Sequence, residues 1–190
     1  MIYPYTNHQL KQIVNEFVTR YEAACEESRM ELIRRSSGGA GIPMPGHLYS
    51  SEAKNAFDDT CTTLREKAMQ VIETEVNALR DSMLKAPPAD VVNIITLLDL
   101  RNDVQMEEIN ALMDKYGDNE QAFRAIAGVS ARKGLHVYHD SPKVQHLNDC
   151  IHLQNTLRDM LSTASAESGH ASKGYAEMVT IQIDLVFPAE

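Results

Sequence analysis

Hydrophobic residues recur at intervals of three and four positions along two long stretches in the N-terminal half of the chain. This spacing is that of one face of an α-helix, so we predict helices over residues 8–35 and 51–85. Between them, the glycines and prolines of residues 36–50 predict a flexible loop. The apolar face of the first helix consists of Leu10, Ile13, Val14, Phe17, Val18, Tyr21, Ala24 and Cys25.

The second predicted helix contains neither glycine nor proline, and at about 1.5 Å per residue it is roughly 50 Å long. A compact chain of this size does not need so long a helix. We therefore predict a long helical hairpin or coiled coil over residues 1–86, with an apolar stripe that packs within the hairpin or against another subunit. Phe57, Leu64 and Val71 are its candidate interaction residues. The whole stripe is Ala53, Phe57, Cys61, Leu64, Ala68, Val71, Ile72, Val76, Leu79 and Met83.

Shorter elements are predicted for residues 87–190, which follow the helix-ending pair Pro87-Pro88. The periodicity indicates three short helices over residues 89–100, from 102 or 103 to 116, and 118–134. Asp118 can cap the third of these, with Gln121 three positions on. Ser141-Pro142 predicts the start of a further helix that ends near residue 161. Serine, alanine and glycine dominate residues 162–174, which we expect to be mobile.

The last segment alternates apolar and polar residues, and this period of two predicts a β-strand over residues 179–187. We expect it to pair partly with the short extended segment Leu135–His139 and partly with an edge in a second subunit or partner. A two-stranded ribbon packed on the chain's own helices is the alternative. The fold class is thus mainly α with a minor C-terminal strand. The face of that strand, a second set of candidate interaction residues, would bury Val179, Ile181, Ile183, Leu185 and Phe187.

The chain has 190 residues and a formal net charge of −9, and no segment of it is basic. A surface that follows nucleic-acid phosphates needs clustered lysine and arginine, and only Arg34-Arg35 and Arg132-Lys133 approach this. Binding to nucleic acid or to an anionic membrane is therefore disfavoured, whereas a basic protein partner is compatible. No apolar stretch is long enough to span a membrane, and the first residues lack the pattern of a signal peptide. Three widely spaced cysteines indicate reduced thiols in a cytoplasmic or virion protein.

Residues 136–152 are a candidate metal or catalytic site, because they include four of the seven histidines and Cys150. Zinc requires four converging ligands. On a helix each residue turns by about 100°, so His146 and Cys150 lie about 40° apart and can share a metal, but His152 points about 160° away from Cys150. We expect no metal and no cofactor, with His146 and Cys150 as the only candidate ligands.

The other histidines of this stretch do not complete a site. In an extended segment Leu135–His139, the side chains of His136 and His139 face opposite sides. A cysteine hydrolase built from His146 and Cys150 is less well supported than a metal site, because nothing marks an oxyanion hole or a nucleophile elbow. We therefore predict that the protein is not an enzyme.

The three short helices within residues 89–134 also match a winged helix-turn-helix, with residues 118–133 as the recognition helix. Against this, the region is acidic, and Asp118 and Glu120 would face phosphate groups. A module that binds a peptide or a protein, or a plain packing unit, is the other interpretation.

Residues 48–134 have an order that resembles small helical accessory proteins from the structural gene clusters of tailed phages. The resemblance lies in the capped, charged helix, in Pro87-Pro88, and in the runs Ile94-Ile-Thr-Leu-Leu-Asp-Leu-Arg101 and Glu107-Glu-Ile-Asn-Ala-Leu-Met-Asp-Lys-Tyr-Gly-Asp-Asn119. It implies an assembly, scaffolding or virion-associated role without catalysis, and it carries over no functional residue.

The sequence therefore predicts a non-catalytic protein-interaction protein that forms a homo-oligomer. One alternative is an acidic inhibitor or regulator of a nucleic-acid-binding host protein, since a strongly acidic chain favours basic partners. Another is a helix-turn-helix DNA-binding regulator.

Overall fold

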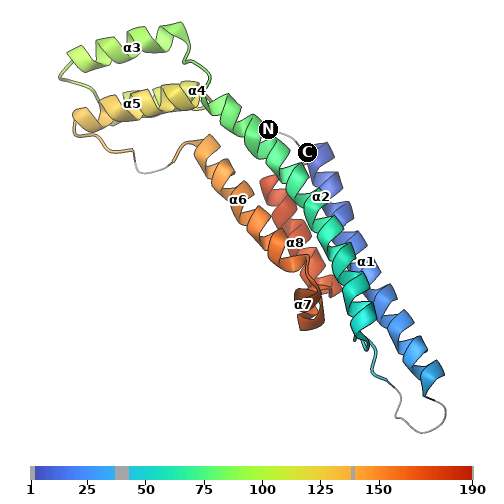
Figure 1. Cartoon of the computed structure of the whole chain (residues 1–190). Helices are drawn as coiled ribbons and strands as arrows, with labels where there is room; N and C mark the ends of the chain where they lie inside the picture. Colours follow the sequence, from blue (N-terminus) through green and yellow to red (C-terminus); the bar gives the residue numbers. More distant parts are fainter. Residues whose placement is uncertain (1–2, 37–42, 138–139, 190) are drawn as a thin grey trace. The chain divides into compact units, whose positions relative to one another are not determined.

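The structure is a computed structural model that describes residues 3–36, 43–137 and 140–189. The regular structure of these residues is helical and contains no β-strand, which confirms the mainly α prediction and shows that the predicted C-terminal strand is wrong (Figure 1). The elements, in chain order, are α1 (Pro4–Arg35), α2 (Ser51–Met83), α3 (Ala89–Leu100), α4 (Met106–Tyr116), α5 (Glu120–Arg132), α6 (Pro142–Met160), α7 (Thr163–Ser165), the π-helical turn η1 (Ala166–His170) and α8 (Lys173–Val186).

The segment predicted as a strand belongs to α8, because its apolar residues also fit a helical period. Val179, Ile183 and Phe187 of this segment recur every four residues, and they are buried on one side together with Ala176, three positions before them. A helix satisfies its backbone hydrogen bonds internally, whereas a strand needs a partner. The expected partner offers none: residues 135–137 are irregular, and Tyr138 and His139 lie outside the described residues.

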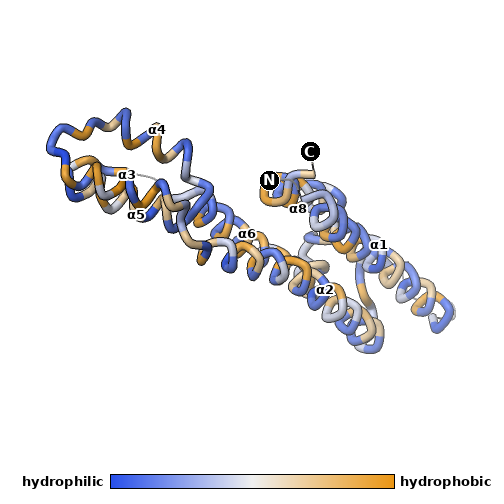
Figure 2. The backbone as a smooth tube through the Cα atoms, turned by 90° about the horizontal axis from the view of Figure 1, so that it is seen from above, coloured by the Kyte–Doolittle hydropathy of each residue, from blue (hydrophilic) through white to orange (hydrophobic). Residues whose placement is uncertain are grey.

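The two long helices begin and end close to the predicted positions. Pro4 occupies the first turn of α1, where its missing N–H costs nothing, and the Ser50 hydroxyl accepts a hydrogen bond from the Ala53 N–H (3.0 Å) at the start of α2. Of the predicted apolar face of α1, all residues except Ala24 are buried. Hydrophobic positions recur at intervals along both helices (Figure 2).

The chain divides into two compact units. Unit 1 consists of Met1–Glu73 and Cys150–Glu190, and unit 2 is Thr74–Asp149. Both boundaries fall inside helices, the first within α2 and the second within α6. Unit 2 is therefore inserted in sequence between the two halves of unit 1.

The core of unit 1 brings together α1 and α8, the first and last helices of the chain. They run antiparallel, because the buried Asn7 of α1 donates hydrogen bonds from Nδ2 to Asp184 Oδ1 (2.8 Å) and to the Phe187 carbonyl (2.7 Å) at the far end of α8. The Tyr3 N–H donates to the Pro188 carbonyl at 2.6 Å. The two ends of the described chain consequently lie side by side (Figure 1).

Acid should weaken this junction. Hydrogen bonds from Lys11 and then from Asn7 lower the pKa of Asp184 below its usual value. A depressed carboxyl pKa contributes stability that is present above the unfolded value of about 4 and is lost as the pH falls through the folded one. Asp184→Asn should lower the free energy of unfolding by about 1 kcal/mol at neutral pH, because the side chain is half exposed. Melting curves at about pH 6 and pH 3 check this: the deficit should shrink at the lower pH, and an unchanged deficit would contradict it.

Residues 162–174, expected to be mobile, form α7 and η1 and belong to the core of unit 1. Ala166 and Ala171 are buried. The Ser162 hydroxyl caps α7 by accepting a hydrogen bond from the Ser165 N–H. Thr163 donates to Asp58 of α2 (3.3 Å). Small side chains predict mobility only when nothing covers them, and here α2 lies close by.

Unit 2 is built around α5, which packs against both α3 and α4. Asn119, and not the predicted Asp118, caps α5 by accepting a hydrogen bond from the Ala122 N–H at 2.9 Å. The Arg132 and Lys133 side chains bind Asp99 of α3 at 3.2 and 2.6 Å. The buried core of this unit comprises Val91, Leu98, Val104, Ile109, Met113, Tyr116, Ala122, Phe123, Ile126 and Val129.

A buried carboxylate fixes the start of α5 to the start of α6. Glu120 is 2% exposed; its Oε1 accepts from Arg124 Nε at 2.5 Å, and its Oε2 accepts from the Ser141 hydroxyl. The Ser141 oxygen in turn accepts from the Val144 N–H (3.2 Å), which caps α6. The predicted helix start at Ser141-Pro142 is thus confirmed, and the same serine also satisfies a buried charge.

Candidate functional site

The two candidate metal ligands lie on α6, where Cys150 is fully buried and His146 is partly buried. Burial lowers the pKa of His146, and the nearby Asp149 and Glu75 carboxylates oppose that shift. Within the described ranges, no group of three or more histidine, cysteine or acidic residues is arranged to hold a metal ion. His139 lies outside those ranges.

The other two cysteines, Cys25 and Cys61, are also buried, which disfavours their thiolate forms. Burial raises the pKa of the Cys25 thiol and raises that of Cys61 to about 11. With a pKa of about 11 the Cys61 thiol is protonated at neutral pH, and the thiolate is the reactive form. Cys61 lies 3.9 Å from the hydroxyl of Thr163, which fits a packing role.

The candidate interaction residues on α2 face inward. Phe57 and Leu64 are 2% and 1% exposed, and Val71 is partly buried. Phe57 packs against the rings of Phe17 and Tyr21 of α1, with centroids 5.9 and 5.2 Å away. The structure therefore covers much of this stripe within the chain itself.

The candidate residues on α8 separate onto opposite sides of the helix. Val179 and Ile183 are fully buried, whereas Ile181 and Leu185 are 59% and 78% exposed. Met178, 45% exposed, shares their side at the helical spacing of three and then four residues. These three residues, Met178, Ile181 and Leu185, form what we call the outer face of α8.

A second uncovered apolar surface lies on α3 of unit 2. Val92, Leu97 and Leu100 are each more than half exposed, on the side of α3 opposite the buried Val91 and Leu98. The high overall hydropathy of α3 is the signal that could have revealed it, because a helix that is apolar all round has more apolar surface than one neighbour covers.

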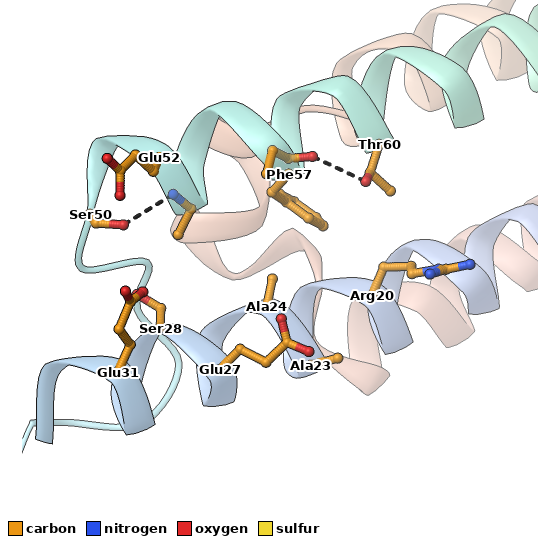
Figure 3. Close-up of a pocket in the computed structure, with 12 residues that line it drawn as sticks. Arg20, Ala23, Ala24, Glu27, Ser28, Glu31, Ser50, Glu52, Phe57 and Thr60 are labelled. Atoms are coloured by element: carbon orange, nitrogen blue, oxygen red, sulfur yellow. Dashed lines mark hydrogen bonds between the residues drawn. The ribbon is translucent and has the colours of Figure 1, made fainter. Parts of the chain in front are cut away.

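A groove of about 430 Å³ lies between α1 and α2 in unit 1 (Figure 3). Ala24 of α1 and the Phe57 ring of α2 point towards each other across it. The segment before α2 is held to α1 at one end of the groove, because the Tyr49 N–H donates to the Ser28 hydroxyl at 2.8 Å. The lining residues are Arg20, Ala23, Ala24, Glu27, Ser28, Glu31, Ser50, Glu52, Ala53, Ala56, Phe57 and Thr60.

The rim of this groove is acidic. Glu31 pairs with Arg35 (2.5 Å) and Arg20 pairs with Glu16 (3.3 Å), whereas Glu27 and Glu52 form no ion pair with any described residue. Nothing in the sequence spacing around Glu27 shows that α1 and α2 leave a gap beside it.

Comparison of the chain with protein-family models, with curated proteins and with solved structures gave no match to any of them. Among the described residues, no helix has both the length and the apolar composition that a membrane span requires.

Proposed function

We propose that this protein is a non-catalytic interaction protein that binds a second copy of itself through the outer face of α8, in an assembly or scaffolding role of the phage accessory type. The observation that carries the proposal is the uncovered row Met178, Ile181 and Leu185. Large aliphatic side chains grouped on one face of a helix are typical of a protein interface.

The spacing of this face fits helix pairing. Gly174, Met178, Ile181 and Leu185 follow one another at intervals of four, three and four residues, which is the heptad pattern of a two-helix seam. The glycine allows close approach of the two backbones. Because α8 offers only about two heptads, the contact is modest and depends on concentration.

The flanking charges favour a parallel arrangement of the two copies. In a parallel pair, Glu177 lies opposite the neutral Gln182 of the other helix. In an antiparallel pair, Glu177 would meet Asp184, and two carboxylates would repel each other. A parallel second copy therefore covers the apolar row and avoids the repulsion between the flanking carboxylates.

The remaining two alternatives have unequal support. A recognition helix must expose its reading face, but α5 is the most enclosed helix of unit 2, and Arg132 and Lys133 already bind Asp99. DNA binding thus gains no support from this arrangement. The acidic-regulator alternative is favoured by one specific observation, the acidic groove between α1 and α2.

The test is the solution mass of Ile181→Asp/Leu185→Asp, measured by light scattering over a range of concentrations. Both side chains are exposed, so the variant should stay folded while the oligomer dissociates to the monomer. The matched control, Val92→Asp/Leu97→Asp, adds the same charges to the exposed face of α3 and should leave the mass unchanged. A wild-type protein that stays monomeric at every concentration, or an unchanged mass in the α8 variant, would overturn the proposal.

A further inference from the structure

We propose that the groove between α1 and α2 binds a basic amphipathic helix of a partner protein, with an arginine side chain seated between the two helices. The groove combines an apolar floor with two carboxylates, Glu27 and Glu52, that have no ion-pair partner in the described part of the chain (Figure 3). This inference rests on the proposed protein-binding role but uses residues that the outer face of α8 does not share, so each can fail separately.

The floor of the groove exists because both helices carry small side chains where they face each other. Ala23 and Ala24 of α1 lie opposite Ala53 and Ala56 of α2, and the buried Phe57 closes the space between them. Larger residues at these positions would fill the gap. An apolar floor of this kind accepts the aliphatic part of a long side chain, whose charged end can then reach the rim.

The rim supplies the complementary charge. Glu27 and Glu31 are one helical turn apart on α1, and Glu52 lies across the groove in the first turn of α2. Glu27 and Glu52 have no ion-pair partner among the described residues, and Arg20 at the other end already binds Glu16. A planar guanidinium can donate hydrogen bonds to two carboxylates at once, which a compact ammonium cannot do in the same geometry.

The occupant that fits these features is a helix with basic residues three or four positions apart. Such residues project from one face, with the same repeat as Glu27 and Glu31. Small apolar residues beside them would rest on the alanines. Helix-in-groove binding of this kind is a common mode of peptide recognition, and unit 1 carries a net charge of −5, which adds attraction at longer range.

The experiment uses the full chain and a fluorescent helical peptide of alanine, leucine and arginine, with the arginines four positions apart. Fluorescence anisotropy gives the dissociation constant. We expect Glu27→Gln/Glu52→Gln to weaken binding about tenfold. The matched control Glu22→Gln/Asp59→Asn removes two exposed carboxylates from the same helices outside the groove, and it should change the affinity less than twofold. Equal losses in the two variants would show attraction to net charge alone and would overturn the proposal.

A second variant tests the floor without changing any charge. Ala56→Leu places a larger side chain in the groove from an exposed position of α2. The fold should be retained, which circular dichroism checks, while peptide binding weakens.

Replacing arginine by lysine in the peptide should also weaken binding. If spermine competes as effectively as the arginine peptide, or if the arginine peptide does not bind to the wild-type protein, the groove is not a site for a helical partner.

Discussion

Replacing Ile183 with aspartate should unfold unit 1, whereas the same replacement at Leu185 should leave its stability almost unchanged. The Ile183 side chain on α8 is fully buried. Aspartate there would place a carboxylate in the apolar core of unit 1, at a cost on the order of 4 kcal/mol or more. Leu185 is 78% exposed, and surface substitutions of this kind usually stay within about 0.5 kcal/mol.

The stabilities of these two variants distinguish a C-terminal helix from the β-strand that the alternation of residues predicts. In a strand, positions 183 and 185 point to the same side, and both variants would be equally harmful. In a helix the two positions lie about 160° apart, and only the variant at position 183 lowers the stability. Melting followed by circular dichroism, with hydrogen exchange of α1 and α8, reports on unit 1. Measurement at low protein concentration removes any effect of self-association. Equal losses of stability in the two variants would contradict the helical assignment.

Ser141→Ala should destabilise unit 2 by about 2 to 4 kcal/mol, far more than the loss of an ordinary helix cap. The hydroxyl caps α6 through the Val144 N–H, and removing a cap costs about 1 kcal/mol. It also donates to the buried carboxylate of Glu120, which would lose one of its two partners, and an unsatisfied buried polar group costs about 1 to 3 kcal/mol more.

Ser172→Ala provides the matched control. Ser172 caps α8 by accepting from the Tyr175 N–H, but it is exposed and serves no buried charge. Its replacement should cost about 1 kcal/mol. Chemical unfolding, with hydrogen exchange resolved for α5 and α6, measures both effects. If the two serine variants lose similar stability, Glu120 does not depend on Ser141.

Helix positions were predictable wherever proline, glycine or a capping serine interrupts the apolar period. Pro87-Pro88 and Ser141-Pro142 set helix ends that the structure confirms to within a few residues. The cap of α5 was placed one residue early, because Asp118 and Asn119 are equally suitable by residue type. The structure places the cap at Asn119, and the next residue, Glu120, binds Ser141 at the start of α6.

The C-terminal helix was missed because its sequence satisfies two periods at once. Valine and isoleucine at positions 179, 181 and 183 indicate a strand locally. The residues that favour a helix are the buried Ala176 and Phe187, which extend the spacing of three and four in both directions. The absence of a partner strand among the described residues then decides the outcome, and that is a property of the whole fold.

The candidate site was only partly visible in the sequence. Ile181 and Leu185 were selected for a strand face that does not exist, yet both are exposed on α8. The groove was not predictable, because Ala24 and Ala56 form its floor only when α1 and α2 come together. Pairing between distant segments leaves no trace in local periodicity.

Because Asn7 and Phe187 are hydrogen-bonded partners 180 positions apart, unit 1 cannot be completed before α8 has been synthesised. At translation rates of about 5–20 residues per second, the synthesis of α8 ends roughly 8 to 30 s after that of α1. During that interval the apolar face of α1 has no α8 to cover it, while the whole of unit 2 is already available to fold. A nascent chain stalled before α8 would therefore present a folded insert beside a bare amphipathic helix, which is the kind of surface that chaperones bind.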